Sequence, residues 1–328
     1  MSPILIAVIA LALIYAFMNG MNDSSSIVAT MISSRAMAPR AALAMTAVAE
    51  FMGPFIFGIA VAKTIGRGVV NSDVITTHVI LAAILSAVLW NLFTSYLGVP
   101  SSSSHALIGG LIGAVGMGAG LQAIQAAGLE KILIPLFIAP VIGFIIGYIV
   151  LEIVVRLSWD ASPIINETFK RYQLLTVIVL GLSHSSNDAP KTMGIITLAL
   201  LTEKYLNTFI VPTWVILLSA LAMAAGTAVG GQRLIRTVGG KFYKIQPIDA
   251  FSTQLASALV VLTASLTGGP VSATQVISSA VMGVGAAARP NKVRWKIAQE
   301  IGTAWILTIP STALVAALIF KLLTRSLQ

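Results

Sequence analysis

One short polar stretch occurs twice within otherwise apolar segments of this chain. Asn22 and Asp23 interrupt one apolar run, and Asn187 and Asp188 interrupt another, 165 residues later. A carboxylate in the middle of a membrane span costs roughly 2.5–3.5 kcal/mol on insertion scales, so its presence indicates a functional site. Two such pairs at matching places in two halves predict one binding site to which both halves contribute.

The composition is that of a membrane protein with many spans. Hydrophobic residues make up 57% of the 328 residues, charged residues only 9%, and the mean hydropathy is +0.94. A soluble protein of this length cannot bury so much apolar surface. The strict alternation of an outer-membrane barrel is absent from the sequence, so we predict an all-α polytopic fold. The chain has no Cys, which excludes disulfides and thiol chemistry.

A second landmark is repeated at nearly the same offset. Gly98-Val99-Pro100 is followed by four serines, Gly268-Gly269-Pro270 is followed by Val-Ser-Ala-Thr, and the two prolines lie 170 residues apart. Each sequence is typical of a helix end, a proline and the capped start of a new helix. We interpret the two stretches as the tips of re-entrant hairpins. The prediction is an inverted-topology repeat with discontinuous helices and two re-entrant hairpins.

This interpretation fixes the expected order along the chain. The first repeat covers 1–157, a central polar loop covers 158–171, and the second repeat covers 172–328. The Asn-Asp pairs lie in the runs at 3–32 and 172–201, where we expect them to break the helices. Further apolar runs lie at 41–62, 78–97, 105–120, 132–157, 209–229, 251–266, 276–288 and 297–322. Loops separate them, such as the one at 121–131 and a basic loop at 233–247.

Lys and Arg are divided unequally between the two sides that this topology defines. The loops on one side hold 13 of them and those on the other side hold 6. Because cytoplasmic loops collect positive charge, we expect the richer side in the cytoplasm, both termini outside, and the protein in the plasma (inner) membrane. The same rule accounts for the net charge of +9, so no nucleic-acid partner is predicted. The richer loops are those at 33–40, 156–172, 233–247 and 289–296.

Each predicted tip ends at the start of a helix, where unpaired amides and about half a positive charge suit an anion. Hydroxyls at both tips add donors that hold an oxyanion without neutralising it. Ser and Thr are also common as packing residues in membrane helices, so a structural role is the alternative for each one. The glycines at 109, 110 and 113 are expected to permit close helix contact. The candidate anion-binding hydroxyls are Ser101, Ser102, Ser103, Ser104, Ser272 and Thr274.

The Asn-Asp pairs supply carboxylate and amide oxygens, which suit a hard cation such as Na⁺. Two buried carboxylates would repel an anion unless one or two small cations or protons bind as well. The residue types therefore predict cation-coupled anion uptake. Lys191 either neutralises charge near Asp188 or touches the anion.

Other polar residues also lie in the apolar runs. His184 and His105 are candidates for proton relay, with helix packing as the alternative. Glu50 and Glu152 are treated as secondary, each pairing with a basic group near an interface. An intramembrane enzyme is not expected, because the adjacent His184 and Ser185 cannot form a base–nucleophile pair unaided.

Four segments in order resemble the inorganic phosphate transporter family, the Pit-type permeases. Residues 19–23 (Asn-Gly-Met-Asn-Asp) resemble its Gly-Ala-Asn-Asp signature, and 183–194 resemble its second copy, Ser-His-Gly-x-Asn-Asp-x-x-Lys-x-Met-Gly. Residues 100–106 and 270–275 are similar to its Pro-Val-Ser-Thr-Thr-His/Gln tips, and 303–310 to its last span.

The resemblance covers nearly the whole chain, with a few departures. Met21 and Ser185 replace small or Gly residues, 24–26 (Ser-Ser-Ser) replace a more apolar run, and the central hydrophilic insert of many members is only a short loop here.

The resemblance implies a symporter that imports inorganic phosphate with Na⁺ or H⁺ by alternating access, without an enzymatic cofactor. Sulfate, another oxyanion or a metal–phosphate complex is the alternative substrate, and an anion channel is the alternative class. The partners are membrane lipid and, by default, a second copy of the chain, because a moving bundle needs a static scaffold. Phosphate is assigned to Ser101, Ser102, Ser103, Ser104, Ser272, Thr274, Lys191, Ser24, Asn22 and Asn187. Na⁺ is assigned to Asn22, Asp23, Asn187, Asp188, Ser104 and Gln275.

Overall fold

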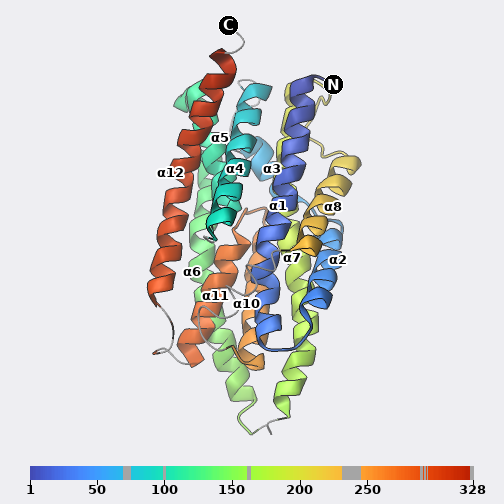
Figure 1. Ribbon diagram of the computed structural model, residues 1–328, viewed down its shortest axis with the longest axis vertical. Coiled ribbons are helices and arrows are strands. Elements are labelled where there is room, and N and C mark those ends of the chain that lie inside the picture. Colours follow the sequence, from blue (N-terminus) through green and yellow to red (C-terminus); the bar gives the residue numbers. More distant parts are fainter. Residues whose placement is uncertain are drawn as a thin grey trace.

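The chain folds into a bundle of helices (Figure 1). The computed structural model describes residues 1–68, 75–98, 101–160, 164–230, 245–288, 291, 293 and 295–325. Every regular element within these ranges is a helix, so the predicted all-α class is confirmed. By length and composition, six of the described helices are able to cross a membrane. Pro100 and most of the predicted basic loop at 233–247 lie outside the described residues.

The helices follow the predicted order. Those before the central connection are α1 (Pro3–Ser33), α2 (Pro39–Phe57), α3 (Ala60–Gly68), α4 (Thr77–Leu97), α5 (Ser103–Gly118), the 3₁₀ turn η1 (Leu121–Ala123) and α6 (Ala126–Leu157). Those after it are α7 (Ile165–Thr202), α8 (Thr213–Val229), α10 (Pro247–Leu266), α11 (Ala273–Ala288) and α12 (Trp295–Arg325).

Local sequence explains where several helices begin. Pro stands in the first turn of α1, α2 and α10, where its missing N–H would have no helical partner. Ser2, Thr76 and Ser102 precede α1, α4 and α5, and their hydroxyls accept an amide N–H from the first turn. Such caps satisfy donors that the helix cannot, so these starts are fixed by residues adjacent in sequence.

Three predicted boundaries differ from the structure. The run at 41–62 is two helices, because α2 ends at Phe57 and Gly58 takes a φ of 84° that side chains disfavour. The predicted loop at 121–131 contains η1 and the first six residues of α6. Half of the predicted polar loop at 158–171 is helical, because α7 begins at Ile165. There Lys170 and Glu167 form an exposed pair at 2.7 Å along the helix.

Both Asn-Asp stretches lie inside continuous helices. α1 runs through Asp23 and α7 through Asp188 without interruption, so the expected breaks at these pairs are wrong. The hydroxyl groups of Ser24 and Ser25 donate to carbonyls of their own helix, at 2.9 and 2.7 Å, which satisfies them without unwinding the backbone. The helix breaks that bear on the site are at the two tips, between α4 and α5 and between α10 and α11.

The two halves of the chain are interleaved. α1 packs against α8 and α2 against α7, while α5 packs against α12 and α6 against α11. The predicted role of Gly109, Gly110 and Gly113 in close helix contact is confirmed, because a Cβ at each would overlap atoms of α12 or α4. Each half therefore covers the apolar faces of the other.

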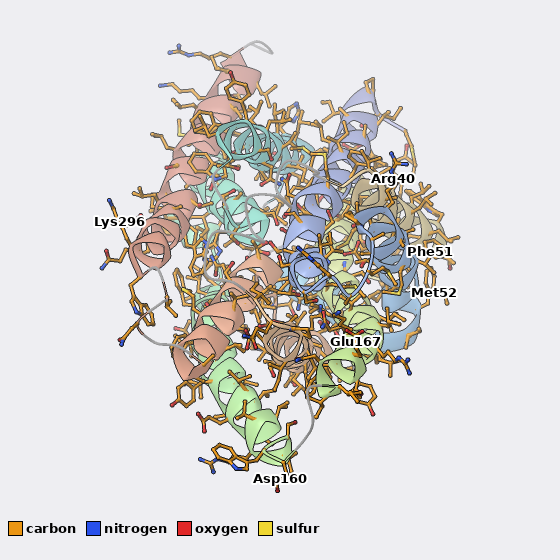
Figure 2. All side chains as sticks on the ribbon, turned by 60° about the horizontal axis from the view of Figure 1, so that its bottom comes forward. Arg40, Phe51, Met52, Asp160, Glu167 and Lys296 are labelled. Atoms are coloured by element: carbon orange, nitrogen blue, oxygen red, sulfur yellow. The ribbon has the colours of Figure 1, made fainter. Side chains whose placement is uncertain are left out.

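The two hairpins approach the middle of the bundle from opposite ends. In Figure 1 the start of α1 and the end of α12 lie at one end, with α4 and α5, whereas the end of α6, the start of α7, α10 and α11 lie toward the other. The tips meet where the Ser104 hydroxyl donates to the Val271 carbonyl at 3.1 Å. The exposed side chains labelled in Figure 2, such as Arg40, Asp160 and Lys296, lie on the outside of the bundle.

Candidate functional site

A cluster of charged side chains is buried where α1, α2 and α7 meet the hairpin tips. Its members are Asp23, Glu50, His184, Asp188 and Lys191, and each exposes 4% or less of its surface. Charges inside a membrane bundle are costly unless they pair. The contacts within this charged cluster therefore determine what it can bind.

The His184 imidazole is shared by three carboxylates. Its Nδ1 lies 2.7 Å from Glu50 Oε1, and its Nε2 lies 3.4 Å from Asp23 Oδ2 and 3.7 Å from Asp188 Oδ2. Glu50 also accepts a hydrogen bond from the Thr227 hydroxyl of α8. An ionised carboxylate only accepts hydrogen bonds, so with Glu50 ionised the donor in this short contact is Nδ1.

Glu50 is not among the site residues predicted from sequence. We expected it to pair with a basic group near an interface, but its partners are His184 and Thr227, both buried in the centre. The signal was present, since a carboxylate in an apolar run is a site candidate by itself. What the sequence lacked was the packing of α2 against α7.

Asp23, His184 and Asp188 offer three ligand atoms within 4.8 Å of one another. The Thr274 hydroxyl of α11 donates to Asp23 Oδ1 at 2.5 Å. Among the described residues, Asp188 Oδ2 is buried without a hydrogen-bond partner. The structure thus brings both predicted aspartates together in a setting of carboxylate and hydroxyl oxygens that suits a small hard cation. Thr274, predicted as an anion donor, lies beside this carboxylate.

The two asparagines and Gln275 face other groups. The Asn187 side chain donates to the Gly269 carbonyl and accepts from the Val271 amide, both at 3.0 Å, which ties α7 to the second tip. Asn22 Oδ1 accepts from the Ser95 hydroxyl of α4 at 3.0 Å. The Gln275 amide nitrogen lies 3.3 Å from Nδ1 of the buried His105 ring. These contacts position the tips.

The serines of the first tip each have a defined contact. Ser101 donates to the Thr94 hydroxyl at 2.7 Å, and the Ser102 hydroxyl lies 2.7 Å from His105 Nδ1. The Ser103 carbonyl accepts from the Tyr15 hydroxyl at 3.0 Å. Ser104 accepts from Lys191 Nζ at 2.6 Å, and this contact joins the first tip to the charged cluster. Of the other predicted anion donors, Ser272 is buried at the second tip and Ser24 bonds within α1.

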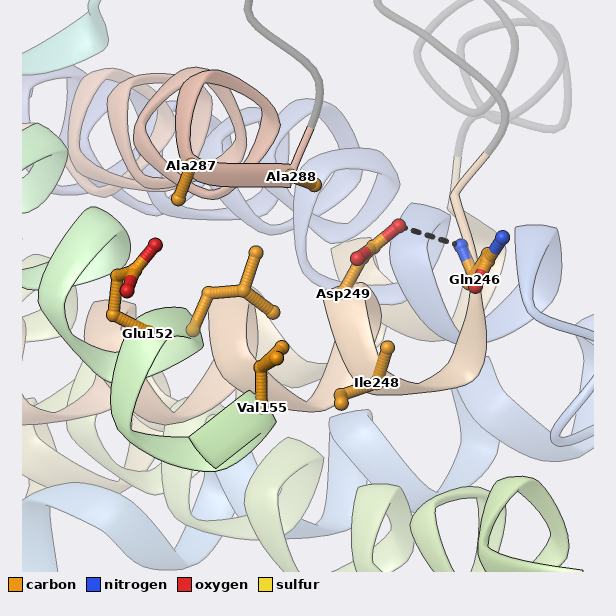
Figure 3. A pocket seen from close by; sticks show the side chains of 8 residues that line it. Glu152, Val155, Gln246, Ile248, Asp249, Ala287 and Ala288 are labelled. Atoms are coloured by element: carbon orange, nitrogen blue, oxygen red, sulfur yellow. Dashed lines mark hydrogen bonds between the residues drawn. The ribbon is translucent and has the colours of Figure 1, made fainter. Parts of the chain in front are cut away.

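A separate pocket of about 250 Å³ lies between α6, α10 and α11, away from the charged cluster (Figure 3). Glu152 and Asp249 line it. Asp249 accepts the Gln246 amide at 3.0 Å, and Glu152 pairs with Arg156 at 3.5 Å, so the expected basic partner of Glu152 is confirmed. Two carboxylates make this pocket unfavourable for a phosphate.

Comparisons with known proteins identify the family. The model of the phosphate transporter family matches residues 19–169 and 156–316. The chain belongs to the phosphate transporter family. Members of this family are transporters, so the protein is not an enzyme. The predicted resemblance to inorganic phosphate permeases is therefore confirmed.

Relatives of this family match the chain along its length. It is 39% identical over 320 residues to a probable low-affinity inorganic phosphate transporter of Rhizobium meliloti (strain 1021), covering 97% of this chain and 96% of the relative. A protein of the same description from Bacillus subtilis (strain 168) is 40% identical over 322 residues, with the same coverage. A solved structure of a sodium-dependent phosphate transporter superposes with a TM-score of 0.91 at 23% identity, covering 99% of this chain and 100% of that one. This last likeness confirms the fold.

Packing explains one departure from the family pattern. Ser185 stands beside the second Asn-Asp pair, and Gly53 of α2 lies directly opposite, where a Cβ would overlap the Ser185 hydroxyl. A Cβ there would also overlap the Leu182 carbonyl oxygen, so the glycine on α2 makes room for both the α7 backbone and the Ser185 side chain.

Proposed function

We propose that this protein is a symporter that imports inorganic phosphate together with Na⁺ or H⁺ by alternating access. The family and the phosphate transporters among its relatives support phosphate as the substrate. The sodium dependence of the protein with the similar fold favours Na⁺ as the coupling ion. The observation that carries coupling is the charge balance of the buried cluster.

The cluster holds three carboxylates against one ammonium and one imidazole. With all three carboxylates ionised, the net charge of the cluster is negative whether or not the imidazole is protonated. Each unit of negative charge on a phosphate 5 Å from an unbalanced carboxylate would be repelled by roughly 3 kcal/mol at an effective dielectric constant of 20. A cation bound by Asp23 and Asp188 removes this repulsion, so phosphate and cation bind together.

The phosphate site in this proposal lies at the two tips. α5 and α11 both begin there, and helix starts offer free amides and partial positive charge to an anion. The hydroxyl groups of Ser104 and Ser272 lie at these starts, and both are buried. Binding would exchange the contact between Ser104 and Val271 for contacts with the anion, which links occupancy to the separation of the tips.

The same proposal treats 1–157 and 172–328 as inverted repeats. It is supported by the reciprocal packing of α1 on α8 and α7 on α2, and of α5 on α12 and α11 on α6. Hairpins at opposite ends of the bundle (Figure 1) agree with opposite orientations of the two halves. The excess of Lys and Arg on one side supports termini outside a plasma membrane. A homodimer remains our default assembly.

Uptake of radioactive phosphate into proteoliposomes tests the function. We expect accumulation above equilibrium with an inward gradient of Na⁺ or of protons, and its loss in Asp23→Asn and Asp188→Asn. Asp160→Asn, at an exposed position, is the matched control and should transport normally. Equilibration that ignores every gradient would replace the symporter with a channel, and movement of sulfate instead of phosphate would change the substrate.

A further inference from the structure

Lys191 is completely buried, and all three N–H donors of its ammonium group form hydrogen bonds within the protein. Nζ lies 2.5 Å from Asp188 Oδ1, 2.6 Å from Ser104 Oγ and 2.6 Å from the Val271 carbonyl oxygen. An ammonium group has three N–H donors, so each proton has a protein acceptor. The contacts leave no proton of Lys191 for a phosphate while this arrangement persists.

The three acceptors form the kind of site that holds a hard metal cation. They are one carboxylate, one hydroxyl and one main-chain carbonyl, and they come from α7 and from both tips. Oxygens of these types bind hard cations such as Ca²⁺, and all three lie within 2.6 Å of the Lys191 nitrogen. The ammonium thus occupies the centre of an oxygen cage.

The corresponding contact in the other half lacks the ammonium. Asp23 precedes Asp188 by 165 residues and Ser104 precedes Thr274 by 170, which are the offsets of the two repeated landmarks. Thr274 donates directly to Asp23 at 2.5 Å, whereas Lys191 Nζ lies between Ser104 and Asp188.

The two halves differ in the residue that follows each Asn-Asp pair at this position. The residue 165 positions before Lys191 is Ser26, so the first half carries no positive side chain at this place. The two Asn-Asp pairs therefore have the same backbone setting and different counter-charges.

We propose that Lys191 is a tethered cation that fills the cation site of the second half. One exchangeable cation site remains, at Asp23, Thr274 and Oδ2 of Asp188, which accepts no hydrogen bond and lies 3.7 Å from His184 Nε2. The transporter then couples phosphate to one cation fewer than its two Asn-Asp pairs would otherwise hold. The consequence for coupling rests on the proposed symport, but occupation of the cage by Lys191 does not.

The decisive variant is Lys191→Ser, which makes the second half match Ser26 in the first. Binding of ²²Na⁺ to the purified protein is measured at fixed pH, with choline replacing Na⁺. We expect one more bound Na⁺ per chain than in wild type. Lys204→Ser, at an exposed lysine, should leave the number unchanged. In proteoliposomes, Lys191→Ser should move one more positive charge per phosphate, and its Hill coefficient for Na⁺ should rise by about one.

A folded Lys191→Ser protein that binds no additional Na⁺ would overturn the proposal. If this variant does not fold in any salt, Lys191→Ala provides the second test, because it also removes the ammonium and leaves Asp188, Ser104 and the Val271 carbonyl in place. It should also bind one more Na⁺ per chain than wild type, and a folded protein with the wild-type number would refute the proposal. Failure of wild-type protein to accumulate phosphate, with a Na⁺ gained by Lys191→Ser, would reject the symport and retain the tethered cation.

Discussion

Replacement of Glu50 by Ala tests whether the charged cluster holds the bundle together. Two donors point at this fully buried carboxylate, the His184 ring at 2.7 Å and the Thr227 hydroxyl. Leaving each without a partner costs about 1–3 kcal/mol, and removal of one member of a buried pair costs about 3–5 kcal/mol. We therefore expect Glu50→Ala to destabilise the protein by about 3–5 kcal/mol.

This loss converts to a measurable shift. With an unfolding entropy of roughly 2.1 cal/mol/K per residue, 328 residues give about 0.7 kcal/mol/K, so the melting temperature should fall by about 4–7 °C. The assay heats the protein in detergent and measures the fraction that remains folded by size-exclusion chromatography with fluorescence detection. Glu152→Ala is the control, because that carboxylate is partly exposed and forms only a surface pair with Arg156, so it should change the melting temperature by less than about 1 °C. Equal shifts in the two variants would refute the reasoning.

Three further predictions follow from packing and from the tips. Gly113→Ala should destabilise the protein by about 1–3 kcal/mol, because its Cβ would overlap the α12 backbone. Gly302 has open space around it, so in the same melting assay Gly302→Ala should be neutral or stabilising by up to about 1 kcal/mol. Tyr15→Phe loses a buried hydrogen bond to the first tip and should lower the free energy of unfolding by about 0.5–1.5 kcal/mol. The control is Tyr148→Phe on the exposed surface, which should lower it by less than about 0.5 kcal/mol. Equal melting temperatures of the two variants would contradict a structural role for the hydrogen bond of Tyr15. The chain has no Cys, so Ser272→Cys gives one reactive site, and phosphate should slow its maleimide labelling while choline chloride does not; unchanged labelling would remove this tip from the phosphate site.

Much of the fold follows from local sequence. Apolar runs of membrane-crossing length predict the helices, and a proline followed by hydroxyl residues predicts the capped start of α5. Gly58 shows the limit, since hydropathy continues across it and only its backbone conformation separates α2 from α3. The Asn-Asp stretches show another, because polar residues interrupt an apolar pattern without interrupting the helix when their hydroxyls bond within it.

The site was predictable only in part. Two aspartates in repeated positions indicated a shared site, and the structure brings them to the same imidazole. The contact between Glu50 and His184 joins residues 134 positions apart and depends on how α2 packs on α7, which no local pattern encodes. The three acceptors around Lys191 likewise come from segments that meet only in the folded bundle.

The reciprocal packing of the two halves has a consequence for biogenesis. The glycine face of α5 is covered by α12, and α5 ends at Gly118 whereas α12 begins at Trp295. At about 5–20 residues per second, a ribosome needs roughly 10–35 s to synthesise the chain between them. During that time α5 has lipid where its partner helix will lie. Because helix association in a bilayer relies on close packing and polar contacts, this face of α5 stays without its partner until α12 emerges.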